Sequence, residues 1–288
     1  MEIPKIKLIC IVGPTAVGKS DFAVEYALKN NGEIISADSR QVYVGLDIGT
    51  GKITREEMRS VPHHLLDVAD PKKQFNVEQF KTLAQKAIED ISARGKLPII
   101  CGGTGFYIEA VIGNISYPNV PHDQRLRKKL YYKTAEELFK MLSKIDPKFS
   151  LSLNNSEKNN KQRLVRFIEV GKKLGQIPPV SKSGSIYDVE WIGLTAPTEI
   201  LKERIQNRLV RRIEHGMVEE AKNLHANGLS WKRMEELGLE YRYLAYYLQE
   251  KMLLDKMKGL LEMEIWHYAK RQLVWFKRNK DINWIEVK

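Results

Sequence analysis

Residues 13–20 read GPTAVGKS and match the phosphate-binding loop G-x-x-x-x-G-K-S at every defined position. The preceding residues 6–12 form a short apolar, β-rich run of the kind found in buried strands. Residues 22–27 then place apolar side chains at helical spacing. Strand, glycine loop and helix in this order are the context that the motif requires, so the start of the chain predicts an α/β fold with an anion site.

The loop residues suit phosphate binding for separate reasons. Glycines at both ends permit close backbone approach, and the amides that follow can point at one anion beside a helix N-terminus. Lys19 supplies positive charge, and the Ser20 hydroxyl is placed to ligate Mg²⁺. The residues predicted to hold the phosphates are Gly13, Pro14, Thr15, Ala16, Val17, Gly18, Lys19 and Ser20.

Strand and helix patterns alternate over the first 110 residues. Strands are predicted at 33–37 and 97–101, with a helix at 77–94 between them. Such alternation is typical of a doubly wound parallel sheet, which binds ligands at the carboxyl ends of its strands. Further helices are predicted at 124–132, 135–142, 160–174, 199–212, 217–226 and 260–278, a Tyr-rich helical segment at 239–248, and strands at 189–194 and 281–287.

The positive charge of the chain is concentrated in its middle. Residues 122–182 carry 15 basic and 6 acidic side chains and so supply +9 of the net +11. We therefore predict a P-loop α/β core made of residues 1–121 and 183–288, interrupted by a basic helical insertion domain, residues 122–182. A basic segment beside a balanced core favours a polyanionic partner, although a solvated lysine-rich helix face would give the same counts.

Cysteine content and hydropathy bear on the cellular compartment of the protein and on whether it spans a membrane. Cys10 and Cys101 each lie within an apolar strand-like run, which indicates buried free thiols and neither zinc nor a disulfide framework. No apolar run approaches the ~18 residues of a membrane span, and the few residues before the first strand do not fit a signal peptide. We expect a cytoplasmic monomer with no membrane partner.

Asp38 is the first candidate for chemistry outside the loop. Hydrolysing ATPases hold Mg²⁺ with an acid after an apolar strand, but the strand at 97–101 continues into GGTG. Asp38 instead follows the strand at 33–37, at the sheet edge that carries the phosphate loop. It is a candidate base, and helix capping is the alternative role for an Asp-Ser pair.

At this point the chain resembles the tRNA dimethylallyltransferase family, also called tRNA isopentenyltransferases. The blocks that carry the resemblance, in order, are GPTAVGKS, SADSRQVYVGLDIGTGK, VPHHLLDV, LPIICGGTGFY, QRLVRFIEV and YAKRQLVWFKR. The resemblance implies that the loop binds the diphosphate of dimethylallyl diphosphate, with Mg²⁺ as cofactor. The prenyl group would pass to the exocyclic amine of the adenosine just 3′ of the anticodon of certain tRNAs.

The resemblance also assigns roles to single residues. Asp38 matches the family's general base, and Thr104 matches a residue at the reaction centre. Arg208 resembles the arginine on the diphosphate, with Arg204 one turn earlier on the same helix face. Either arginine could instead be a surface ion-pair partner.

The anticodon stem-loop of tRNA is the expected macromolecular partner. Arg163 and Arg166 share one helix face, whereas Leu164 and Val165 can pack inward. By the resemblance, the predicted tRNA-binding residues are Asp38, Ser39, Arg40, Gln41, Thr104, Arg125, Gln162, Arg163, Leu164, Val165, Arg166, Lys270, Arg271 and Gln272.

Two other functions remain open on sequence alone. An ATP-dependent P-loop kinase would use the same loop, but it explains neither the basic insertion nor the ordered blocks. A non-enzymatic RNA-binding module would tolerate loss of Lys19 and Asp38, and both are present.

Overall fold

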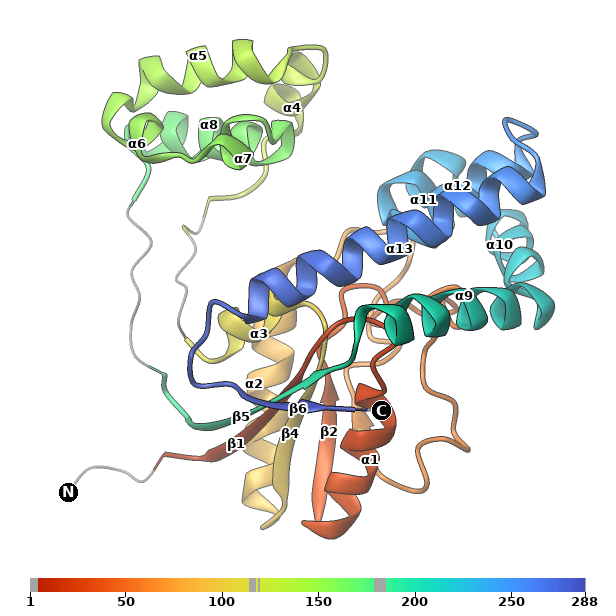
Figure 1. Cartoon of the computed structure of the whole chain (residues 1–288). Coiled ribbons are helices and arrows are strands. Elements are labelled where there is room, and N and C mark those ends of the chain that lie inside the picture. Colours follow the sequence, from red (N-terminus) through yellow and green to blue (C-terminus); the bar gives the residue numbers. More distant parts are fainter. Residues whose placement is uncertain (1–4, 114–117, 119, 179–184, 288) are drawn as a thin grey trace. The chain divides into compact units, whose positions relative to one another are not determined.

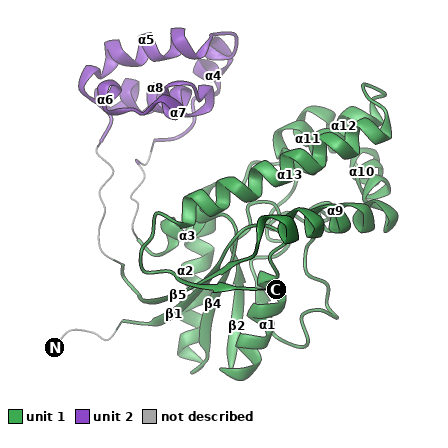
Figure 2. Ribbon diagram, viewed as in Figure 1, with its two compact units in different colours: residues 1–114, 184–288 green, residues 115–183 purple. Residues whose placement is uncertain are grey.

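The computed structural model describes residues 5–113, 118, 120–178 and 185–287. The chain divides into two compact units, Met1–Asn114 with Gly184–Lys288 and Ile115–Ser183 (Figure 2). The predicted insertion, residues 122–182, falls within the second unit. The predicted C-terminal end of the insertion, residue 182, falls in residues 179–184, which lie outside the described residues.

The first unit is built on a six-stranded sheet in which all pairings are parallel, in the order β3-β2-β4-β1-β5-β6 (Figure 1). The predicted parallel α/β fold is confirmed. The strands are β1 Lys7–Val12, β2 Gly32–Ser36, β3 His63–His64, β4 Leu97–Gly102, β5 Asp188–Thr195 and β6 Asn283–Glu286. Since β1 lies between β4 and β5, its carboxyl end opens at the middle of the sheet edge.

Each face of the sheet has its own apolar core. Along β1, Cys10 packs on the same side as α2, whereas Ile9 and Ile11 pack against α1. This alternation follows from the two-residue repeat of a strand. Cys101 lies in the second core, so the two buried free cysteines sit on opposite sides of the sheet.

Helices cover both faces and extend past the strand ends (Figure 1). The longest, α13, begins at Leu254, earlier than the predicted 260, because buried Met257 and Leu261 continue its four-residue apolar spacing. The helices of this unit are α1 Lys19–Lys29, α2 Val77–Ala93, α3 Gly105–Val111, α9 Thr198–Glu214, α10 Met217–Ala226, α11 Trp231–Leu237, α12 Leu239–Leu248 and α13 Leu254–Phe276. None of the described helices has the length and apolarity needed to cross a bilayer.

The second unit is a small helical domain around its own core. Leu130, Leu138, Leu142, Leu164 and Ile168 fill that core, and side-chain caps at several helix starts fix the turns. Its helices are α4 Gln124–Leu130, α5 Ala135–Ile145, α6 Pro147–Ser152, α7 Asn155–Lys158 and α8 Lys161–Leu174. Two short helices, α6 and α7, connect α5 to α8.

The partly buried carboxylate of Glu220, on α10, anchors the loop that contains residues 47–49 of the first unit. Glu220 accepts hydrogen bonds from the backbone N–H groups of Asp47 (3.0 Å), Ile48 (2.7 Å) and Gly49 (2.9 Å). It also accepts one from the Tyr241 hydroxyl (2.7 Å). Three consecutive amides converging on one carboxylate form an anion nest, here filled by the protein itself. The conformation of residues 47–49 therefore depends on a side chain about 170 positions away.

We predict that Glu220→Gln destabilises the fold by about 2–3 kcal/mol, because an amide cannot accept all four donors and leaves some of them unsatisfied. Thermal unfolding and proteolysis within residues 46–54 measure the effect. The matched control is Glu219→Gln, an exposed neighbour that pairs with Lys222 (3.4 Å) and with no other described side chain, and it should change stability by less than about 0.5 kcal/mol. Equal stability of the two variants would contradict the anchoring role.

Candidate active site

The phosphate-binding loop joins the end of β1 to the start of α1. Gly13 has φ 148°, and a Cβ there would lie 2.4 Å from the Leu194 carbonyl oxygen of β5. Gly18 starts α1 with a left-handed φ of 98°. The loop therefore packs against a neighbouring strand end and turns into the helix only with glycine at these positions.

Lys19 folds back over the loop and is partly enclosed by protein. Its Nζ donates to the Pro14 carbonyl oxygen at 2.6 Å. Enclosure lowers the pKa of Lys19 to about 8, with Arg208 lowering it and Asp38 opposing the shift. A bound anion would reverse this shift by stabilising the charged ammonium, so anion binding and protonation of Lys19 are coupled.

Gln272 of α13 connects the phosphate-binding loop to the loop that follows β4. Its Oε1 accepts from the Thr15 amide (2.7 Å), and its Nε2 donates to the Gly103 carbonyl oxygen (3.0 Å). A side chain on residue 103 would fit badly, since its Cβ would lie 2.0 Å from that Nε2. Gln272 was expected among the tRNA contacts. The side chain is buried and both ends of its amide are bound within the protein, so in this structure it braces the two loops, and the tRNA contact stays a prediction.

Asp38 follows β2 and closes a tight turn. Its Oδ1 accepts from the backbone amides of Arg40 (2.7 Å) and Gln41 (3.3 Å). The capping alternative is therefore partly correct, although the capped element is a turn and not a helix. No described residue donates a hydrogen bond to the other carboxylate oxygen, Oδ2, and Asp38 lines a cavity. Its second oxygen is available for chemistry.

Thr104 joins the ends of β2 and β4. Its amide donates to the Ala37 carbonyl oxygen (3.1 Å), and its Oγ1 accepts from the Ser39 amide (3.1 Å). Tyr268 of α13 lines the same cavity as Asp38, and burial raises the pKa of its phenol. Asp38 and Thr104, predicted from separate sequence blocks, are thus brought together through Ser39.

Two arginines of α9 face the loop. Arg204 donates to the Val17 carbonyl oxygen at 3.3 Å. Arg208 packs close to Gly51, where an added Cβ would lie 3.0 Å from its Nη2. No described carboxylate forms an ion pair with Arg208. The surface ion-pair alternative therefore finds no support for this residue.

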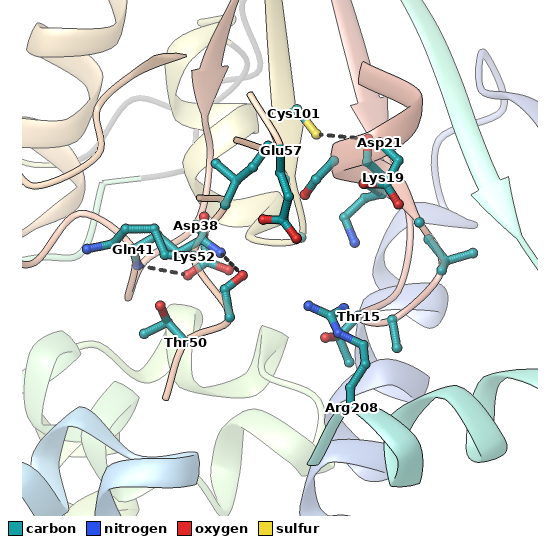
Figure 3. Close-up of a pocket in the computed structure, with 18 of the residues that line it drawn as sticks. Thr15, Lys19, Asp21, Asp38, Gln41, Thr50, Lys52, Glu57, Cys101 and Arg208 are labelled. Carbon is teal, nitrogen blue, oxygen red and sulfur yellow. Dashed lines mark hydrogen bonds between the residues drawn. The ribbon is translucent and has the colours of Figure 1, made fainter. Parts of the chain in front are cut away.

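These groups surround one cavity of about 930 Å³. Figure 3 shows Lys19, Asp38 and Arg208 approaching it from the phosphate-binding loop, the end of β2 and α9. A second cavity of about 290 Å³ shares part of this wall, including Asp38 and Arg208. It continues towards α12 and α13. An anion site and a candidate base thus lie on one continuous space at the sheet edge.

The residues present are compatible with Mg²⁺ bound through a phosphate. Ser20 is exposed at the start of α1 and lines the larger cavity, as do the carboxylates Asp21 and Glu57. The described residues contain no cluster of three or more His, Cys, Asp or Glu side chains able to hold a metal. Mg²⁺ commonly takes one or two protein ligands and completes its shell with phosphate oxygens and water, so a single hydroxyl is sufficient here.

The remaining predicted tRNA-binding residues of the first unit differ in exposure and in how far their side chains are already hydrogen-bonded within the protein. The Gln41 amide bonds to Ser36 (3.2 Å) and the Gly51 carbonyl oxygen (3.3 Å), so it holds the turn against the glycine-rich loop. Lys270 and Arg271 are exposed, lying over the rings of Trp266 and Tyr268 respectively. Arg40 and Arg271 both line the smaller cavity. These cations remain candidates, and so does Gln41, which also lines the larger cavity.

In the second unit, the predicted block on α8 divides into buried and exposed positions. Leu164 is fully buried in the helical core and supports the block from inside, and its tRNA contact stays a prediction. Val165 also packs against that core. The exposed positions are Gln162, Arg163 and, on α4, Arg125. Arg163 pairs with Glu157 at 3.0 Å.

A buried glutamate organises the arginines of this unit. Glu169 accepts from Arg127 Nε (2.6 Å) and Nη2 (2.9 Å), and Arg166 lies 3.4 Å from it. Burial alone would raise the pKa of Glu169, but these partners and the Asp123 amide lower it to about 2. The carboxylate is therefore charged near neutral pH and fixes both cations at the surface of the unit.

Sequence reasoning missed several residues of the site. Tyr268 lies within the recognised C-terminal block but carries no signal that separates a site aromatic from a core one. Glu220 and Arg212 hold residues 47–49 from distant helices, Arg212 by donating to the Gly49 carbonyl oxygen (2.9 Å). Only the three closely spaced glycines 45, 49 and 51 hinted that this loop has a constrained shape.

The sequence matches known proteins over nearly its whole length. The family profile described as IPP transferase covers residues 41–279. The tRNA dimethylallyltransferase of Anoxybacillus flavithermus is 39% identical over 286 residues, with 98% of this chain and 90% of that protein covered. The tRNA dimethylallyltransferase 2 of Treponema denticola is 42% identical over 286 residues, with 96% and 95% covered.

Solved structures give the same result. The tRNA isopentenylpyrophosphate transferase of Bacillus halodurans superposes with a TM-score of 0.74 at 39% identity, covering 98% of this chain and 90% of that one. A eukaryotic dimethylallyltransferase acting on tRNA superposes with a TM-score of 0.80 at 26% identity, covering 98% and 74%. The resemblance found in the sequence is therefore confirmed, and the chain belongs to the IPP transferase family, that of the tRNA dimethylallyltransferases.

Proposed function

We propose that this chain transfers a dimethylallyl group from dimethylallyl diphosphate to the exocyclic amine of the adenosine 3′-adjacent to the anticodon, releasing diphosphate. The observation that carries the proposal is the shared cavity: the phosphate-binding loop and Asp38 line the same space. The names of the relatives support the reaction and the tRNA substrate. We propose a cytoplasmic monomer as the working form.

The loop and Arg208 act on the leaving group. As the bond between the allylic carbon and the diphosphate oxygen breaks, its electron pair moves onto the diphosphate. Loop amides, the Lys19 ammonium and the Arg208 guanidinium are positioned to stabilise this growing negative charge. When bound, Mg²⁺ would be held by Ser20 and would supply further neutralisation of the diphosphate.

Asp38 acts on the acceptor. The lone pair of the exocyclic nitrogen forms the new bond to the allylic carbon, and the nitrogen then has to lose a proton. Asp38 Oδ2 accepts that proton, since Oδ1 is already held by the turn. Thr104 holds the neighbouring backbone by accepting from the Ser39 amide, and Tyr268 lines the same cavity. The adenosine must be turned out of the anticodon stack to reach this position.

The kinase alternative is not favoured. The relatives that match the whole chain are transferases acting on tRNA, and the strand β4 ends in glycines instead of a metal-binding acid. A kinase would also leave the basic second unit without a substrate to bind.

The direct test is incubation of the protein with radiolabelled dimethylallyl diphosphate and unmodified bulk tRNA, with and without Mg²⁺. We expect label in tRNA, located on adenosine after nuclease digestion, and little transfer when Mg²⁺ is chelated. Binding of tRNA without transfer of label would support a non-catalytic RNA-binding protein and would overturn the proposal.

We predict that the affinity for an unreactive dimethylallyl diphosphate analogue falls as pH rises above about 8. Lys19 in the free protein loses its proton there, and a bound anion favours the protonated form, so each pH unit above that value costs up to about tenfold in affinity. Titrations between pH 7 and 10 measure it. Lys19→Arg is the control, because the arginine stays charged over this pH range. Any effect that comes from ionisation of the ligand would change the affinity of both proteins equally. Parallel pH profiles for the two proteins would contradict the role of Lys19.

We predict that Asp38→Asn keeps the fold, since the amide oxygen can still accept from the two turn amides. Both substrates should bind, while transfer slows by about 10²–10⁴ through loss of the base. Single-turnover transfer at saturating substrates, across a Mg²⁺ series and beside a melting curve, measures the effect. A near-normal rate refutes the base, and recovery with added Mg²⁺ would reassign Asp38 to metal binding.

A further inference from the structure

Two adjacent tyrosines of the second unit are unusually exposed. Tyr131 is 69% exposed and Tyr132 is 88% exposed, whereas Tyr241 and Tyr107 of the first unit are almost fully buried. Their rings meet edge to face, with centroids 5.1 Å apart at 89°. Exposed pairs of large aromatic side chains are typical of binding surfaces, because leaving them in water forgoes the free energy of burial.

The turn that carries the tyrosines is fixed at both ends. On one side, Leu130 is buried in the core of the unit, and its carbonyl oxygen accepts from the Lys133 amide (3.1 Å). On the other side, Thr134 and Glu137 form a capping box at the start of α5. Figure 2 shows this unit, with the turn between α4 and α5. A rigid turn presents the rings in a set position, which lowers the entropy lost on binding.

The chain segment that leads into the tyrosines is strongly basic. Residues 124–133 include Arg125, Arg127, Lys128, Lys129 and Lys133 and no acidic residue. Arg127 and Lys133 have carboxylate partners, whereas none of the described carboxylates pairs with the exposed Arg125, Lys128 or Lys129. Free cations beside exposed aromatic rings are the combination that binds single-stranded nucleic acid.

The aromatic pair is connected to α8. Lys161, the first residue of α8, donates to the Tyr131 carbonyl oxygen at 3.3 Å. Arg163 and Arg166 follow on the same helix, so the tyrosines adjoin the block already predicted to contact tRNA.

We propose that Tyr131 and Tyr132 are a stacking platform for an unpaired base of the tRNA substrate, with the neighbouring lysines holding the adjoining phosphates. The proposal rests on the proposed function and adds to it a specific contact outside the cavity. Charge favours a polyanion as the occupant, and the flat rings favour a base that is not paired within a helix.

The test compares tRNA binding by wild type and three variants. Tyr131→Ala/Tyr132→Ala should weaken binding of an unmodified anticodon stem-loop by about 5–150-fold for each base that stacks. Tyr131→Phe/Tyr132→Phe keeps the rings and should bind nearly as wild type. Leu151→Ala is the matched control, since Leu151 is an 80% exposed apolar residue of the same unit, and it should have no effect.

Salt and RNA structure identify the kind of contact. The alanine variant should keep the wild-type dependence of affinity on salt, whereas Lys128→Ala/Lys129→Ala should flatten it by up to about one unit of slope for each phosphate that is no longer neutralised. The alanine variant should also lose little affinity for a fully paired duplex of the same length. An equal loss for duplex and stem-loop would overturn stacking on an unpaired base.

Failure of the proposal can be told apart from failure of the proposed function. If wild type prenylates tRNA and the alanine variant binds the stem-loop equally well, the platform is refuted and the function stands. If wild type neither binds nor prenylates tRNA, the proposed function fails. A change in oligomeric state on size-exclusion chromatography would instead assign the tyrosines to contacts between copies of the chain and overturn the proposal.

Discussion

The candidate site depends on one buried amide. Gln272 of α13 lies between the phosphate-binding loop and the loop that follows β4. It accepts a hydrogen bond from a backbone amide of the first loop and donates one to a backbone carbonyl oxygen of the second. These loops continue β1 and β4, which are adjacent in the sheet. The distance between the anion site and the groups around Asp38 is therefore set by a helix lying across the strand ends. Both loops hold one relative position because the amide leaves neither of its ends unsatisfied.

The environment created by this arrangement is unevenly charged. Several cations near the cavity are already bound by the protein: Lys52 contacts two aspartates at 2.6 Å, and Arg212 contacts Glu240 at 3.1 Å. Lys19 and Arg208 lack such carboxylate partners among the described residues. A polyanion entering the cavity would thus meet cations that gain much of their electrostatic stabilisation from it. This difference separates the groups that build the wall from those that act on a ligand.

The sequence was sufficient for the fold and for much of the site, because strand, loop and helix patterns are local. The position of Asp38 followed from the rule that parallel strands end at one edge, whereas Thr104 was assigned by the family resemblance. A motif block mixes inward and outward side chains, and only packing shows that Gln272 and Leu164 of these blocks are buried. Glu220 and Tyr268 could not be found, since their partners lie far away in sequence and depend on tertiary structure.

The long separation between Thr15 and Gln272 has a consequence for synthesis on the ribosome. The two residues are 257 positions apart, and β1 also pairs with β5, which lies beyond the second unit. A nascent chain exposing β1, β2 and β4 has its phosphate-binding loop but not the helix that fixes it. At about 5–20 residues per second, the remaining residues take several seconds or more to emerge. During that interval the second unit can form its own core, while the catalytic edge of the sheet is completed only as the last helix leaves the exit tunnel.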